Sequence, residues 1–164
     1  MNWYLVLLFL HIASVVIFAG GILARQLVRS TAEHSPDVRN FAVLSTAAGR
    51  IENLMVIPGN LAVILFGVIL ALLTGTPILG FLQGGARNWL LASNVLLLLG
   101  LLAVPLIFVP RGRRFDLALQ DALAQGEWTP QLRAVVQDPV VRATHAAEIA
   151  MIAIVAFLMV FKPF

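Results

Sequence analysis

Long runs of apolar residues separated by shorter polar segments dominate the chain. Four runs are long enough to cross a bilayer as helices, which takes about 20 residues at about 1.5 Å of rise each. We expect these spans at about residues 3–23, 54–73, 89–109 and 139–161. The pattern predicts an all-α fold, an integral membrane four-helix bundle that forms a single transmembrane domain over residues 1–164.

The two longer connections carry signals of further short amphipathic helices. Ser35-Pro36-Asp37 places a capping hydroxyl before a proline, which predicts a helix from there to about Ala48, ended by Gly49. In the second connection, apolar residues recur at the spacing of one helical face: Phe115, Leu119, Ala122 and Leu123. We expect this helix to end at Gly126 and to lie along the membrane surface. Thr129-Pro130 and Asp138-Pro139 repeat the cap-then-proline pattern.

Proline and glycine inside the spans predict irregular helices and close helix packing. Pro58 in the second span and Pro105 in the third remove backbone donors, so we expect a bend at each. Small residues suit tight helix contacts, and the pair Gly20-Gly21 and Gly59 are examples.

Composition confirms the class of protein and excludes several others. Hydrophobic residues make up 60% of the chain and charged residues 12%, with a mean hydropathy of +0.96, which excludes a water-soluble enzyme and a disordered chain. The absence of cysteine excludes disulfides, Cys-ligated zinc, iron-sulfur clusters and a thiol nucleophile. The arginines lie beside the apolar runs, so we interpret the basic charge as a topology signal and expect no nucleic-acid partner.

The distribution of basic residues predicts the orientation. Nine of the 11 Lys and Arg residues lie in the two long connections: Arg25, Arg29, Arg39, Arg50, Arg111, Arg113, Arg114, Arg133 and Arg142. Arg87 and Lys162 are the other two. Basic loops stay in the cytoplasm, so both termini are expected outside. The aromatic residues Trp3, Trp89 and Phe164 then lie near the outer interface, where such rings anchor helices.

Polar residues inside the spans are the first place to look for function, because they are costly in hydrocarbon. Counted inward from the outer edge, His11, Asn94 and Met151 lie roughly 12, 8 and 15 Å deep and can share one layer. His145 lies roughly 24 Å deep. It belongs to a second layer with these residues: Glu148, Glu52, Arg142 and Arg50.

These depths bear on the hypothesis that the bundle holds haem b. Two histidines on one iron need nitrogens about 4 Å apart, whereas His11 and His145 differ by roughly 12 Å in depth. We therefore expect His11 as the axial ligand, with Met151 or no protein group opposite it, and Asn94 hydrogen-bonded to the second ring nitrogen. The alternative is structural: His11 bonds to an Asn on a neighbouring helix.

The second layer has a structural and a functional interpretation. His145 near the membrane face is compatible with an ordinary interfacial residue. Glu148 is expected to pair with Arg142, Arg50 or His145, and such pairing is favoured over a proton relay.

Three segments together resemble a known group of bacterial membrane proteins. They are the first helix with His11 and Gly20-Gly21, the second helix with Arg50 and Met55–Gly59, and the glutamate-bearing last helix with Lys162–Phe164. The pattern resembles the group that includes the HemJ-type protoporphyrinogen oxidases, the CopD copper-resistance proteins and a related family of uncharacterised predicted integral membrane proteins. The likeness covers most of the chain.

The resemblance implies a helical bundle in the bacterial cytoplasmic (inner) membrane, with haem b held by His11. In the HemJ branch it also implies oxidation of a porphyrinogen. HemJ-like sequences have a lysine shortly after the tryptophan that opens the third helix, where this chain has Ser93-Asn94 after Trp89. That departure argues against the oxidase activity and makes the uncharacterised branch the closer likeness.

Three functions remain open from the sequence. The leading one is a haem-b protein for electron transfer or an oxidoreductase step. The second is a non-enzymatic membrane protein, either a homo-oligomer or a small subunit of a larger membrane complex. The third is copper handling through His11 and Met151, because thioether sulfur prefers cuprous ion.

Overall fold

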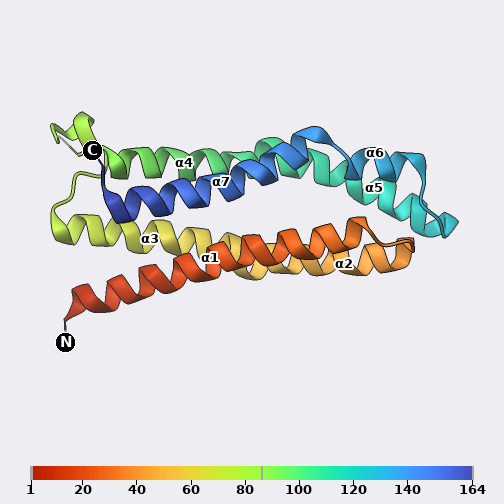
Figure 1. Ribbon diagram of the computed structural model, residues 1–164, viewed down its shortest axis with the longest axis horizontal. Helices are drawn as coiled ribbons and strands as arrows, with labels where there is room; N and C mark the ends of the chain where they lie inside the picture. The colour runs from red at the N-terminus through yellow and green to blue at the C-terminus, as the bar shows by residue number, and fades with distance from the viewer. Residues whose placement is uncertain (1, 86, 164) are drawn as a thin grey trace.

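The computed structural model describes residues 2–85 and 87–163, and these residues form a bundle of helices (Figure 1). Phe164, expected at the outer interface, lies outside the described residues. The elements in chain order are α1 Trp3–Glu33, α2 Val38–Ile51, the π turn η1 Glu52–Val56, α3 Ile57–Thr74, the 3₁₀ turn η2 Gly80–Gln83, α4 Trp89–Ala103, the π turn η3 Val104–Phe108, α5 Val109–Gln125, α6 Pro130–Val136 and α7 Pro139–Phe161.

Four helices are long and apolar enough to cross a membrane, as the sequence predicts. Helix α7, Pro139–Phe161, has the bounds expected for the fourth span. The second and third spans are each part of a longer continuous helical rod. One rod consists of α2, η1 and α3, and the other consists of α4, η3 and α5. Each of these two rods has 37 residues and is therefore about 55 Å long, against a hydrocarbon core of about 30 Å.

The bundle is built from two halves that lie one above the other in Figure 1. In the first half, α1 packs along α2 and α3. In the second, α4 packs on α7 and α5 on α6. Both chain ends lie at one end of the bundle, and α2, α5 and α6 form the opposite end, which we call the arginine-rich end.

The prediction that the helix after the third span lies along the membrane surface is wrong. Helix α5 instead continues the rod of α4 and turns its apolar face toward α2 and α6 (Figure 1). A small core fills this contact, with Phe41, Ala122 and Leu132 buried at its centre. The amphipathic pattern was therefore correct, but its apolar face covers protein rather than lipid.

The capping signals are mostly confirmed. Thr129 and Asp138 accept hydrogen bonds from the first turns of α6 and α7, as expected. At α2 the capping side chain is Asp37, which accepts from two backbone N–H groups, rather than the serine before the proline. The predicted stop at Gly126 is confirmed, but Gly49 does not end α2, which continues to Ile51.

The irregularities predicted at the prolines are π turns. In η1 the Ile57 N–H reaches the carbonyl of Glu52, and the next residue is Pro58. The predicted Pro105 is the second residue of η3, in which the Val109 N–H reaches the carbonyl of Val104, and a further proline, Pro110, follows. Proline has no N–H to bond to the carbonyl four residues back, and at both sites the residue before the proline bonds to the carbonyl five residues back. Such turns are frequent at functional sites.

Candidate functional site

Five ionisable side chains meet where the two halves of the bundle touch. We call this group the charge cluster: Arg25, Arg29, Glu52, His145 and Glu148. Both arginines come from α1, Glu52 is the first residue of η1, and the histidine and Glu148 come from α7. The cluster therefore joins the first half of the bundle to the second.

Arg25 is the centre of this cluster and is only 4% exposed. It donates hydrogen bonds to Glu52 and to Glu148, forming a salt bridge with each. One cation thus holds a carboxylate from each half of the bundle. Burial of such a charge is tolerated only with partners of this kind.

The contacts of His145 are the basis for assigning its tautomer. Arg29 donates a hydrogen bond to Nε2 of His145, and since a guanidinium has donors but no acceptor, Nε2 must be unprotonated. A neutral ring then carries its proton on Nδ1, which donates to Oε2 of Glu148 at 2.9 Å. Nη2 of Arg25 also lies 3.2 Å from this Nδ1, so a second guanidinium faces the ring. The formal charge of the cluster is therefore zero, because two arginines face two carboxylates.

The ring of His145 is also held by packing. It is 4% exposed and stacks on Phe108 of η3, with 4.8 Å between ring centroids. The π turn thus supplies one wall for the imidazole. His145, Arg29 and Phe108 consequently form one rigid corner of the site.

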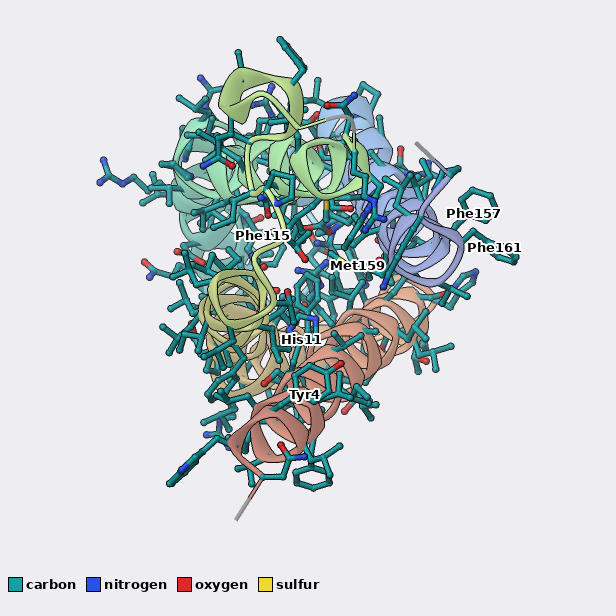
Figure 2. All side chains as sticks on the ribbon, turned by 90° about the vertical axis from the view of Figure 1, so that its left-hand side faces the viewer. Tyr4, His11, Phe115, Phe157, Met159 and Phe161 are labelled. Atoms are coloured by element: carbon teal, nitrogen blue, oxygen red, sulfur yellow. The ribbon has the colours of Figure 1, made fainter. Side chains whose placement is uncertain are left out.

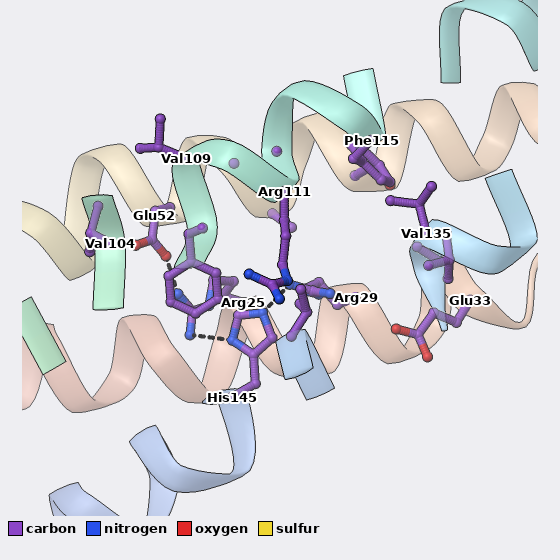
Figure 3. Close-up of a pocket in the computed structure, with 18 of the residues that line it drawn as sticks. Arg25, Arg29, Glu33, Glu52, Val104, Val109, Arg111, Phe115, Val135 and His145 are labelled. Atoms are coloured by element: carbon purple, nitrogen blue, oxygen red, sulfur yellow. Dashed lines mark hydrogen bonds and ion pairs between the residues drawn. The ribbon is translucent and has the colours of Figure 1, made fainter. Parts of the chain in front are cut away.

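A cavity of about 550 Å³ opens beside this corner, between the two halves. Three arginines line it, namely Arg25, Arg29 and Arg111. Figure 3 shows His145 rising from α7 toward the α1 arginines while Arg111 descends from α5 into the same space. Most of the remaining lining is apolar and includes Phe108 and Phe115, and the carboxylates of Glu33 and Glu52 line the cavity as well.

The three arginines differ in how their charge is balanced. Arg25 has two carboxylates, and Arg111 pairs with Asp138 at 3.1 Å from Nε to Oδ2. Within residues 2–85 and 87–163, Arg29 makes no salt bridge, and its side-chain partner is the neutral imidazole. Of the three arginines of the cavity, Arg29 is therefore the one without a salt bridge among these residues, and Glu33 is an acidic residue of the same lining.

His11 lies elsewhere, near the end of the bundle that holds the termini. Figure 2 shows it turned toward the interior, with Met159 facing the same interior and Phe157 and Phe161 pointing outward. Its Nδ1 is buried without a hydrogen-bond partner. His11, Asn94 and Met159 line a small cavity of about 20 Å³.

The sequence-predicted ligand set is only partly brought together. Asn94 shares the small cavity with His11, but its amide donates to the carbonyl of Ile78 at 3.3 Å. Met151 is not among the residues that line this cavity and packs against Gly100 of α4 instead. The structure thus places Met159, rather than Met151, beside His11.

The space beside His11 does not fit a haem. A cavity of about 20 Å³ holds about one water molecule, and Gly67 closes it on one side, where an added Cβ would lie 3.1 Å from the ring of His11. Nor does the described part of the chain contain a group of three or more His, Asp or Glu side chains arranged to hold a metal ion.

The sequence anticipated part of the charge cluster. The pair His145 and Glu148 is confirmed, as is the presence of Glu52. Arg50 and Arg142, expected as partners, are exposed, and the α1 arginines take their place. The sequence does indicate that the α1 arginines face the interior. Residues 18, 22, 25 and 29 follow one another at helical spacing and so lie on one face of α1.

Comparison with known proteins places the chain in a family. It belongs to the predicted integral membrane proteins of the DUF2269 family, whose model matches residues 5–163. No curated protein and no solved structure matches the chain.

Proposed function

We propose that this membrane protein binds an organic anion with an apolar body in the cavity between its two halves. The observation that carries this proposal is that Arg29 lines the cavity while its hydrogen-bond partner is the neutral ring of His145. Arginine is the side chain best suited to carboxylate, sulfate and phosphate groups, since its planar fork matches their oxygens.

The walls of the cavity indicate the rest of the ligand. Apolar residues, chiefly phenylalanine and valine, make up most of the lining beyond the arginines. The volume of about 550 Å³ lies within the range of small-molecule sites, about 300–1,000 Å³. A ligand with one acidic group and an apolar body matches such a lining. Basic pockets between membrane helices near the cytoplasmic face are typical of anionic lipid binding, so lipids and free fatty acids share the required chemistry.

We further propose that the arginine-rich end faces the cytoplasm of a bacterium, as the distribution of basic residues predicts. The cavity would then open near the inner leaflet. Anionic amphiphiles reach that level by diffusion within the membrane.

Native mass spectrometry of the detergent-solubilised protein tests the proposal. One arm adds phosphatidylglycerol and the other adds laurate, each in competition with a zwitterionic lipid. We expect one equivalent of one of the two anions to bind. Arg29→Gln is expected to weaken it by about tenfold to a hundredfold, as for loss of a charged hydrogen bond of about 1.5–3 kcal/mol.

The matched control is Arg39→Gln, which removes the same charge from an exposed position on α2. Equal weakening by both variants would mean that the anion is attracted by general surface charge and would overturn the proposal. Absence of any stoichiometric anion in both arms would overturn it as well.

Haem binding through His11 is a second candidate, supported by the buried Nδ1 that has no partner. It requires α1, α3 and α7 to separate around a space that now holds about one water. A visible absorption spectrum after expression with ample haem is the test. A Soret band lost in His11→Ala supports this candidate, and no band excludes it.

A further inference from the structure

We propose that binding of the anion is coupled to the uptake of one proton by His145. This inference rests on the proposed function, because it concerns what happens when an anion reaches Arg29. Arg29 holds His145 through its Nε2 lone pair, and the same guanidinium faces the cavity. It is therefore shared between the ring and any ligand.

An anionic oxygen competes well for Arg29. Hydrogen bonds between a guanidinium and an anion are charged on both sides and are about twice as strong as neutral ones. Nε2 of the imidazole, in contrast, is a neutral acceptor and forms the weaker hydrogen bond. When the anion takes the donor, the bond from Arg29 to Nε2 breaks and the lone pair of Nε2 becomes free to accept a proton from water.

The charge of the cluster gives the reason for protonation. Without ligand, the charges of the five members sum to zero, so an anion brings one uncompensated negative charge into a largely buried site. His145 is the member whose ordinary pKa, about 6.5, lies closest to neutrality. One proton on Nε2 restores neutrality and places a cation between the ligand and Glu148.

The other arginines near the ring already form salt bridges with carboxylates. Arg25 of α1 is held by Glu52 of η1 and Glu148 of α7, and its Nη2 also lies 3.2 Å from Nδ1 of His145. Arg111 of α5 is held by Asp138. From η3, Phe108 contributes only an aromatic face, which also favours a cation. Glu33, at the last turn of α1, is exposed to solvent.

The step balances without a redox partner. The hydrogen bond from Arg29 to His145 is exchanged for one from Arg29 to the anion. Nε2 gains one proton from solvent, while the Nδ1–H bond to Glu148 stays in place. Release of the anion reverses each change, so the proton leaves when Arg29 returns to the ring.

The test uses decyl sulfate below its micelle concentration, because an alkyl sulfate keeps its charge over the whole range. Isothermal titration calorimetry of the protein in lipid nanodiscs, at pH values between about 5 and 8, measures affinity. Two buffers of different ionisation enthalpy give the number of protons taken up. We expect a value approaching one per anion and an affinity that falls by up to tenfold for each unit of rising pH.

The variant His145→Gln tests whether His145 takes up the proton while the hydrogen bonds of the cluster are kept. A glutamine can accept from Arg29 and donate to Glu148, so it replaces the neutral ring without titrating. We expect this variant to bind with no proton uptake and with pH-independent affinity. His34→Gln, at the exposed end of α1, should keep the coupling of the original chain.

The outcomes are distinct. Binding without proton uptake in the unmodified chain would overturn the coupling and leave the anion site standing. Coupling that persists in His145→Gln would overturn the assignment to His145. Failure of decyl sulfate to bind at any pH, together with failure of both arms of the native mass spectrometry, would overturn the proposed function itself. The buffer comparison needs no variant, so it decides even if His145→Gln does not fold.

Discussion

At the scale of single residues, Arg25 and Arg29 are neighbours on one helix face with different tasks. Arg25 is almost fully buried and satisfies carboxylates from both halves of the bundle. Arg29 makes no salt bridge among the described residues and faces the cavity. One arginine therefore supports the fold, and the other is available to a ligand.

This difference predicts that the same substitution destabilises the protein to different extents at the two positions. Arg25→Gln leaves Glu52 and Glu148 without their cation, and removal of one partner from a buried ion pair costs about 3–5 kcal/mol. Arg29→Gln removes a bond to a neutral ring and is expected to cost about 1–2 kcal/mol at most. Reversible unfolding in mixed micelles measures both. Equal losses in the two variants would contradict this division of tasks.

At the scale of elements, helix-to-helix distance in the first half depends on glycine. A Cβ added at Gly59 of α3 would lie 3.0 Å from the backbone of Phe18 on α1, and backbone cannot move aside as a side-chain tip can. At Gly49 of α2 an added Cβ meets nothing within 4 Å. The two glycines thus differ in packing although both are helical.

We therefore predict that Gly59→Ala destabilises the protein and Gly49→Ala does not. Forcing a methyl into the α1–α3 contact costs about 1–3 kcal/mol, whereas alanine in an open helix position stabilises by up to about 1 kcal/mol. The melting temperatures of both variants in one detergent check this. A Gly59→Ala protein as stable as the parent would show that the two helices are not in such close contact.

The elements also show what the sequence could predict. Helix α7 was located by an apolar run that begins at a strong cap, Asp138-Pro139. The extension of α1 to Glu33 does not follow from hydropathy, because hydropathy falls after residue 23 while the helix continues. The helix end predicted at Gly49 is wrong because a glycine inside a helix costs only about 1 kcal/mol, which does not by itself end the helix.

The site was harder to predict than the fold because it depends on helix rotation. The pair His145 and Glu148 lies on one helix and follows from spacing alone. The choice between Met151 and Met159 beside His11 depends on how α7 is turned and how deep it sits, which spacing does not fix. The same applies to the α1 arginines, whose partners come from η1 and α7.

At the scale of the whole molecule, the two halves are joined by the charge cluster on one side of the cavity and by the small core of α2, α5 and α6 on the other. Apolar packing joins them further toward the termini, where Leu97 and Met151 meet α1 and α3. The cavity is therefore lined by residues of both halves.

The orientation of the molecule is a prediction that the sequence makes easy to test. Because the chain has no cysteine, single cysteines report accessibility without background. In intact cells, a membrane-impermeant maleimide should label Gln83→Cys, in the connection before α4, and leave Glu127→Cys, at the arginine-rich end, unlabelled until the cells are opened. The reverse pattern would place the cavity at the outer face.

The protonation of His145 without ligand is the most direct test of the account. The chain has three histidines, so ¹⁵N-histidine solid-state NMR in bilayers, with His11→Gln and His34→Gln for assignment, resolves the ring nitrogens of His145. The account predicts a neutral ring at neutral pH, with a proton on Nδ1 and a bare Nε2 hydrogen-bonded to Arg29. A ring that carries its proton on Nε2, or on both nitrogens, would contradict it.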